Sequence, residues 1–144
     1  VLDRDLRYVR INELLAEING VSAADHVGKT VREIVPSLAD QAEAALRRVL
    51  DGEEVRGIEL TGETVARPGV IRTWRENWLP VRDAEGAITG IAISAEEITE
   101  EKEAELLRRE AEERYTNIFN SAAVGIGRVS PEGPFLEIND RYCQ

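Results

Sequence analysis

Apolar residues in the first third of the chain recur with helical spacing, and the residues around them are ones that start and stop helices. Asn12 precedes residues 13–19, and Asn19-Gly20 ends that segment. Asparagine is a frequent N-cap and glycine a frequent C-terminal stop. From about Leu38 to Leu50 one helical face is apolar, and Asp51-Gly52 follows it. The pattern predicts a short helix over 13–19 and a longer one over 38–50.

Between these two helices, a hydroxyl residue is followed three positions later by an acid at three places. In such a capping box the hydroxyl accepts a bond from an otherwise unpaired backbone N–H, and the acid reaches back to the cap. The pairs are Ser22 with Asp25, Thr30 with Glu33, and Ser37 with Asp40. They predict two short helical turns and then the start of the longer helix.

After Gly52 the apolar spacing changes from helical to alternating. Three long strands are predicted at Val55–Val65, Val70–Arg82 and Ala87–Ile98. Turn-forming residues join them, and Gly86 can adopt the positive φ of a bulged hairpin. A shorter alternating segment, Leu6–Asn12, predicts one further strand. The expected fold class is α+β with an antiparallel meander.

A highly charged segment, Glu100–Arg114, follows the predicted strands and contains neither glycine nor proline. Its few apolar residues form a thin stripe at helical spacing, which continues beyond the segment. The stripe consists of Ala104, Leu107, Ala111 and Ile118. One chain alone does not bury such a stripe if the helix projects from the domain. We therefore predict a solvated linker helix that forms a homodimer through residues 100–118 and a sheet face.

The end of the chain repeats its beginning. Residues 1–15 align without a gap with residues 128–142, and Ile11-Asn12 meets Ile138-Asn139. A repeat identifies the structural unit before any element is assigned. The alignment predicts a first domain at 1–99, a linker helix at 100–119, and the truncated start of a second copy of that domain at 120–144.

The same alignment leaves the first copy without a counterpart of residues 115–127, which include most of its first strand. Unpaired backbone groups inside a sheet carry a severe penalty. Residues 122–130 carry a closely similar piece of sequence. We expect this tail to insert into the incomplete sheet, in a partner chain, as in domain swapping. The alternative is that the tail packs as a loose hairpin.

Composition narrows the class of protein. With 42% apolar and 32% charged residues, the chain resembles soluble globular proteins, and no apolar run approaches the ~18 residues of a membrane span. A cytoplasmic location is expected for this part, which leaves a membrane anchor elsewhere in the parent protein open. The net charge of −10 argues against nucleic acid as a partner. One histidine and one cysteine exclude a Cys-based or multi-His metal site.

Several motifs occur in an order that resembles a PAS (sensory-box) domain. Residues 8–12 are similar to the second strand of that family with its capping asparagine. The segment 20–30 is similar to the family's "GYS…VGK(S/T)" motif. Trp74 followed by residues 80–86 resembles its "W…P(V/L)RD..G" signature, and residues 97–100 match its terminal "D-I-T-E" motif with Glu97 in place of Asp. Residues 114–144 resemble the opening of a following PAS domain.

The resemblance implies a five-stranded antiparallel sheet with helices on one face, in a bacterial signalling protein. It implies a sensor or relay region that detects a small ligand or passes a conformational change through a dimeric helix to an output domain in the same chain. A histidine kinase of a two-component system is the favoured output. The alternatives are a ligand-free dimerisation or spacer module, and the sensor region of a diguanylate cyclase or phosphodiesterase. No catalysis is expected within this fragment.

No cofactor is expected. Haem-binding members of the family use a histidine on the longer helix, whereas His26 lies in the short-helix segment, where it is expected to be exposed or capping. Flavin-binding members use a photoreactive cysteine, but Cys143 lies in the truncated second copy and the flavin-adduct motif is absent. We interpret Cys143 as an ordinary thiol.

Two sets of site residues are predicted. Trp74 and Trp78 are four apart in one strand, so they share a face, and with Leu38 and Leu46 they are the candidates for a ligand pocket. Packing of the sheet against helices is the alternative for both tryptophans. Glu97, Ile98 and Thr99 are expected to relay the signal at the joint between the last strand and the linker helix. The carboxylates of the strands are interpreted as a solvated face; they include Glu53, Glu54, Glu59, Glu63 and Glu76.

Overall fold

The computed structural model describes residues 1–139, so Cys143 lies outside the described residues. The chain divides into two units, Val1–Thr99 and a second that begins at Glu100. Each unit is described by itself.

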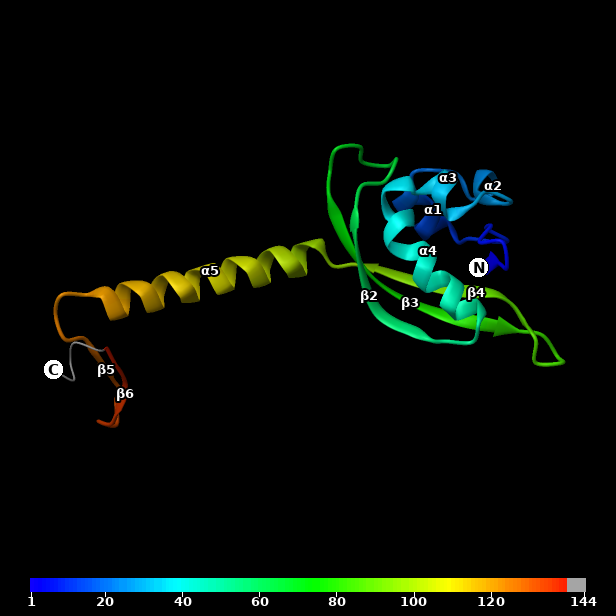
Figure 1. Ribbon diagram of the computed structural model, residues 1–144. Coiled ribbons are helices and arrows are strands. Elements are labelled where there is room, and N and C mark those ends of the chain that lie inside the picture. Colours follow the sequence, from blue (N-terminus) through cyan, green and yellow to red (C-terminus); the bar gives the residue numbers. More distant parts are fainter. Residues whose placement is uncertain (140–144) are drawn as a thin grey trace. The chain divides into compact units, whose positions relative to one another are not determined.

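Four helices of the first unit lie on one side of its sheet (Figure 1). They are α1 (Glu13–Asn19), α2 (Ala23–His26), α3 (Val31–Ile34) and α4 (Pro36–Leu50). The predicted caps are present at the first three. Asn12 Oδ1 accepts the Leu15 N–H at 3.1 Å, Ser22 accepts from Asp25, and Thr30 with Glu33 forms a complete capping box. Gly20 ends α1 at φ 81°, in the left-handed region that glycine tolerates.

The third predicted capping box is wrong. Helix α4 begins at Pro36, and its N-cap Val35 makes no side-chain cap bond. Proline initiates the helix because its ring already holds φ at a helical value and its missing N–H needs no partner. Ser37 therefore lies inside the first turn, and its hydroxyl donates to the Glu63 carbonyl at 2.6 Å instead. That bond fixes the start of α4 to the end of the neighbouring strand.

The sheet of the first unit contains β1 (Leu2–Asp3), β2 (Val55–Gly62), β3 (Arg72–Arg82) and β4 (Ile88–Glu97). Their order is β1-β4-β3-β2, and all neighbours are antiparallel. The three long strands confirm the predicted meander, with ends shortened by a few residues. Gly86 in the β3–β4 turn has φ 87°, as expected for that hairpin.

The predicted strand Leu6–Asn12 is wrong, and four strands replace the expected five in the described sheet. Its ladder contacts are isolated bridges: Leu2–Tyr8 and Arg7–Thr30 are antiparallel, and Tyr8–Val27 is parallel. Tyr8 thus connects β1 to Val27 by single bridges, without forming a strand.

The core of the first unit lies between α4 and the sheet (Figure 1). The apolar stripe predicted for 38–50 faces it, and alternate residues of the strands meet that stripe. The most deeply buried residues of the core include Leu2, Leu46, Val49, Trp74, Trp78 and Ile91. A single packed layer is thus formed by every second side chain of the strands and by the side chains on one face of the helix.

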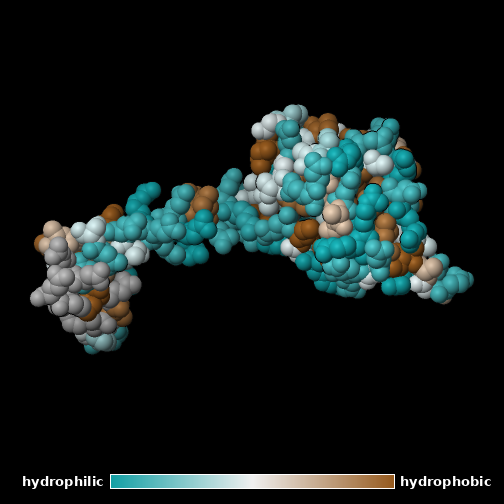
Figure 2. All heavy atoms as spheres, viewed as in Figure 1, coloured by the Kyte–Doolittle hydropathy of each residue, from teal (hydrophilic) through white to brown (hydrophobic). Residues whose placement is uncertain are grey.

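The second unit contains α5 (Thr99–Ser121), β5 (Gly127–Val129) and β6 (Phe135–Ile138). No residue of α5 is buried, and Leu107 is 66% exposed. Figure 2 shows hydrophilic side chains over most of this helix, interrupted by isolated hydrophobic ones. β5 and β6 form an antiparallel pair in which Val129 faces Phe135. With the offset of 127 residues, that pair corresponds to the Leu2–Tyr8 bridge of the first unit.

The turns inside the two copies also correspond. Asp3 N–H donates to the Arg7 carbonyl at 2.8 Å, and Ser130 N–H donates to the Pro134 carbonyl at 2.9 Å. Within this chain, then, residues 127–138 form a hairpin in a sheet of their own. Insertion of the tail into a partner chain stays a prediction.

Candidate functional site

A cavity of about 370 Å³ lies in the first unit between α1, α4 and the sheet. Its apolar walls come from α4 and from three strands. They include Leu38, Ala42, Leu46, Leu60, Trp78 and Ile93. The volume falls in the lower part of the range of small-molecule sites, roughly 300–1,000 Å³. The cavity therefore suits a compact ligand.

One part of the cavity wall is polar and includes Tyr8, Asn19 and Glu76. Trp78 Nε1 donates to Glu76 Oε2 at 2.6 Å. Burial raises the pKa of the Glu76 carboxyl, and the Trp78 hydrogen bond offsets part of that rise. Burial, together with the nearby Glu76, raises the pKa of Tyr8 to about 12, against a smaller opposite effect of Asn19. At neutral pH Tyr8 is therefore an uncharged hydrogen-bonding group.

His26 supports this polar wall from behind. It is fully buried, so the expectation of an exposed or capping histidine is wrong. Its Nδ1 lies 2.8 Å from the Ser22 carbonyl, and its Nε2 lies 3.0 Å from Asn19 Nδ2. A carbonyl only accepts, so Nδ1 carries the proton and Nε2 accepts from Asn19. The ring also contacts Tyr8 edge-on, with centroids 4.9 Å apart.

The predicted pocket residues divide into two groups. Leu38, Leu46 and Trp78 line the cavity, whereas Trp74 does not. Residues i and i+4 of a strand share a face but lie about 13 Å apart, so a compact cavity reaches only one of them. Trp74 packs beneath the Arg72 guanidinium, whose carbon lies 4.9 Å from the ring centroid. For Trp74, packing is the interpretation that fits.

Arg72 is the centre of a buried polar network at the end of α1. Its Nη2 donates to Thr64 Oγ1 and to the Ile18 carbonyl, and Thr64 Oγ1 donates to the same carbonyl at 2.8 Å. Its Nη1 lies 3.1 Å from Glu97 Oε2. A Cβ added to Gly20 would lie 2.2 Å from the Ala66 nitrogen, so α1 also touches the β2–β3 loop directly.

The predicted relay residues lie at the joint that this network reaches. Thr99 Oγ1 donates to Glu97 Oε1 at 3.1 Å and accepts the Thr73 N–H at 3.0 Å. Ile98 is buried, and its N–H donates to the Thr73 carbonyl at 2.8 Å. Glu97 therefore contacts Arg72 with one oxygen and Thr99 with the other. A continuous chain of bonds runs from the Ile18 carbonyl to the first residue of α5.

Two residues of this site, Arg72 and Glu76, were not singled out from the sequence as site residues, and Glu76 was interpreted as part of a solvated face. That interpretation is wrong. The sequence contained the information that places both residues in the site, because residues two apart on a strand share a face. Arg72, Trp74, Glu76 and Trp78 alternate along β3, so the face that buries the tryptophans also receives the two charges.

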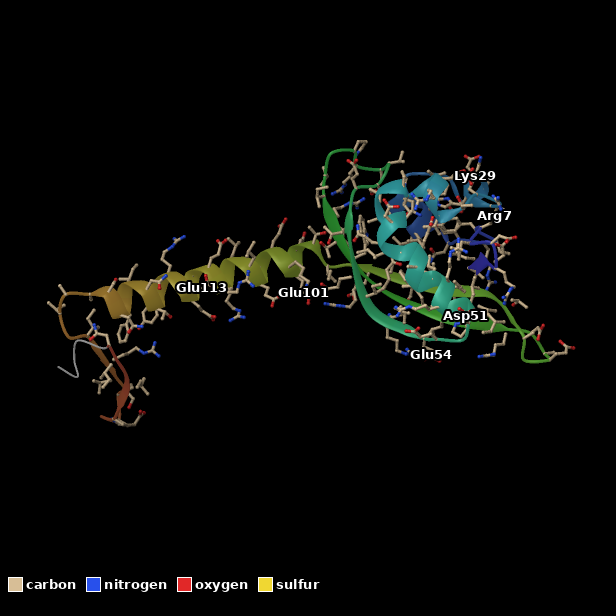
Figure 3. All side chains as sticks on the ribbon, viewed as in Figure 1. Arg7, Lys29, Asp51, Glu54, Glu101 and Glu113 are labelled. Carbon is tan, nitrogen blue, oxygen red and sulfur yellow. The ribbon has the colours of Figure 1, made fainter. Side chains whose placement is uncertain are left out.

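Arg7 and Lys29 lie together in the first unit (Figure 3). Both approach the Glu33 carboxylate, at 3.7 and 3.9 Å. The Thr30 hydrogen bonds, more than these cations, lower the pKa of Glu33. Exposed pairs of this kind contribute little stability. The capping box of α3 is formed by Thr30 and Glu33 themselves.

Residues 1–139 hold no group of three side chains suited to a metal ion. Over the same residues, no helix is both long and apolar enough to cross a membrane.

The fold and this site match known proteins. A family model described as PAS fold matches residues 1–103. The chain belongs to the PAS family. The α+β class and the antiparallel sheet predicted from sequence are confirmed. The comparison with curated proteins found no match.

Among solved structures, this PAS chain is similar to VqmA. A dimer of Vibrio cholerae VqmA without its target DNA shares 22% identity, with a TM-score of 0.59 over 69% of this chain and 44% of that one. A complex of VqmA with ligand and DNA gives 24% identity and a TM-score of 0.59, over 68% and 44% of the two chains. VqmA bound to DPO gives 24% and 0.56, over 68% and 49%. The PAS chain thus spans less than half of these proteins.

The similarity corrects one prediction. From the net charge we predicted that nucleic acid is not a partner. This prediction is wrong, because a protein with this fold occurs in a complex with DNA. The net charge of −10 is that of this chain alone. The part of VqmA that it matches is 44% of that chain. The acidity of a PAS region therefore does not decide what its parent protein binds.

Proposed function

We propose that residues 1–99 form a chemosensory PAS domain, which binds a small ligand and passes the change to α5. The observation that supports it is the cavity of about 370 Å³ with both an apolar and a polar wall. Such a site holds the body of a ligand by burial and fixes its orientation by a few polar groups. The ligand-bound VqmA structures show that a protein of this fold holds a small molecule.

The relay in this proposal starts at α1. Asn19 lines the cavity, and the carbonyl of the preceding residue, Ile18, accepts the bonds from Arg72 and Thr64. A ligand that changes the position of Asn19 changes the partner of Arg72, and with it the Glu97–Thr99 contact. Ligand binding shifts the joint only as far as it stabilises one arrangement over the other.

The output of the parent protein is a separate proposal. The motifs of the PAS domain favour a bacterial histidine kinase, with cyclic-di-GMP enzymes as the alternative. The similarity to VqmA, from work on LuxR-type receptors, adds a DNA-binding output to these candidates. For the fragment itself we propose binding without catalysis. Among the described cavity residues Glu76 is the only carboxylate, whereas acid–base catalysis commonly pairs two groups of opposed pKa.

Dimerisation through α5 belongs to the same proposal, and residues 120–144 are proposed to begin a second PAS domain. The apolar stripe of α5 is unburied in the single chain, with Leu107 and Ile118 each more than 60% exposed. VqmA is described as a dimer. The shared register of Val129–Phe135 and Leu2–Tyr8 supports the second copy. The same exposed stripe favours the second candidate function, a dimerising spacer without a ligand.

Native mass spectrometry of the freshly purified protein, followed by a denatured spectrum, decides between sensor and spacer. A sensor retains a small molecule that is lost on denaturation, and Leu46→Trp, which fills the cavity, lowers its occupancy. Leu106→Trp, an exposed position on α5, is the matched control and keeps the occupancy. An empty protein that is also not stabilised by any compact amphiphile in a thermal-shift screen contradicts the sensor.

A further inference from the structure

Among the described residues that line the cavity, Glu76 is the only carboxylate. Glu76 lies on β3 between Trp74 and Trp78, on the face that packs against the helices. One of its carboxylate oxygens accepts from Trp78 Nε1 at 2.6 Å. No donor from the described residues reaches the other oxygen. A half-buried carboxylate with a single donor from the protein leaves most of its hydrogen-bonding capacity open to a ligand.

The other titratable groups of the cavity do not neutralise Glu76. Tyr8 is uncharged at neutral pH. Arg10, which is exposed, and the Val1 amino group also line the cavity, but neither is among the groups that shift the pKa of Glu76. No salt bridge to Glu76 is present among the described residues. The cavity therefore presents the Glu76 carboxyl group, with the Trp78 indole beside it, together with the aliphatic side chains of α4.

We propose that the ligand of this cavity is a compact amphiphile with a protonated amine, which pairs with Glu76 while its apolar body lies against α4 and Trp78. This inference rests on the proposed sensor function. A ligand carboxylate in this position faces the Glu76 carboxyl, which repels it when ionised. A neutral hydroxyl donates a bond but brings no charge, so it leaves the carboxylate without a counter-ion.

The expected preference follows from hydrogen-bond strengths. The ammonium and the hydroxyl can both donate to the Glu76 carboxylate, but only the ammonium also supplies the opposite charge. We expect a preference of about tenfold, which corresponds to about 1.4 kcal/mol. An amine is therefore expected to bind about ten times more tightly than the alcohol of the same shape.

Three probes of matched shape test the ligand class: cyclohexylmethylamine, cyclohexylmethanol and cyclohexanecarboxylate. Isothermal titration at pH 7 measures their affinities for the full chain, for Glu76→Gln and for Glu96→Gln. The glutamine at 76 keeps an acceptor for Trp78 but removes the charge. Glu96 lies on the opposite face of the sheet with a side chain 71% exposed, so its variant is the matched control. The amine preference is expected in the wild type and the control and is lost in Glu76→Gln.

A second readout uses the wild type alone, so it does not depend on the folding of a variant. Since the amine pairs with the ionised carboxylate, its affinity is expected to fall as pH drops below the pKa of Glu76, while that of the alcohol stays level. Equal affinities of amine and alcohol, or tighter binding of the carboxylate, contradict the proposal of an amine ligand. They do not contradict the proposed sensor function. If none of the probes binds, the ligand class fails as well, and the sensor itself fails only if native mass spectrometry also finds no ligand.

Discussion

Leu6 has a backbone conformation that is unusual for its type. Its φ is 58°, in the left-handed region, and it is the only non-glycine residue with a positive φ in the described chain. The corresponding residue of the second copy is Gly133, at φ 105°. Both residues occupy the same turn, closed by the bonds of Asp3 and Ser130. In the first copy the leucine side chain is buried in the core, which offsets a backbone cost of about 1–2 kcal/mol.

The conformation of Leu6 predicts that Leu6→Gly destabilises the protein less than Leu6→Ala does. Leu6→Ala loses the buried side chain and keeps the backbone cost, whereas Leu6→Gly loses the side chain and relieves that cost. We expect the alanine variant to be destabilised by about 2–4 kcal/mol and the glycine variant by about 1 kcal/mol less. Urea denaturation measures both. A glycine variant less stable than the alanine variant contradicts the conformation of Leu6.

Glu76 predicts a pH dependence of stability. Its folded pKa is raised above the unfolded value by burial, so the protonated form favours folding. The stability it contributes is full below the ordinary pKa of glutamate and is lost as pH rises through the folded value. Glu76→Gln does not titrate. The melting temperature of the variant minus that of the wild type is therefore expected to increase from pH 4 to pH 8. A difference that decreases over this interval contradicts the burial of the carboxyl.

At the scale of elements, the joint between β4 and α5 is held by side chains rather than by the strand ladder alone. Thr99 begins α5 and accepts the Thr73 N–H of the neighbouring strand β3. The helix is thus attached to two strands at once. Both contacts are made by Thr99, the first residue of α5.

Thr99→Ala is expected to separate signalling from folding. The lost bonds cost about 1 kcal/mol of stability, while coupling between ligand and output in the parent protein is expected to fall severalfold. Thr99→Ser keeps the hydroxyl and is expected to retain both properties. Melting temperature and an output assay of the parent protein measure the two effects. A serine variant that fails to signal would show that the methyl group, not the hydroxyl, forms the joint.

At the scale of the whole molecule, the dimer prediction rests on the exposed stripe of α5. Leu107→Glu introduces a charge into that stripe and is expected to weaken dimerisation by at least about tenfold. Leu106→Glu makes the same change beside the stripe and is the matched control. Light scattering after gel filtration, at high micromolar concentration, measures the association. A wild-type monomer at that concentration, or equal effects of both variants, contradicts the proposed interface.

The sequence by itself determined the features that depend on neighbouring residues. The caps at Asn12, Ser22 and Thr30, the apolar face of α4 and the hairpin at Gly86 all follow from interactions within about four residues. The order of these elements was sufficient to recognise the family. The cap predicted at Ser37 was wrong because its bond goes to Glu63, 26 positions away.

Only the tertiary structure decided which polar groups form the site. His26, Arg72 and Glu76 look like surface residues in a one-dimensional pattern, but His26 and Arg72 are buried and Glu76 is half-buried in the folded chain. Trp78 lines the cavity and Trp74 does not. This difference depends on where the helices pack on the sheet, which the alternation of residues along a strand does not predict. Alternation along a strand specifies a face, but the packed helices specify which part of that face is a cavity, because burial is set by contacts between segments and not within them.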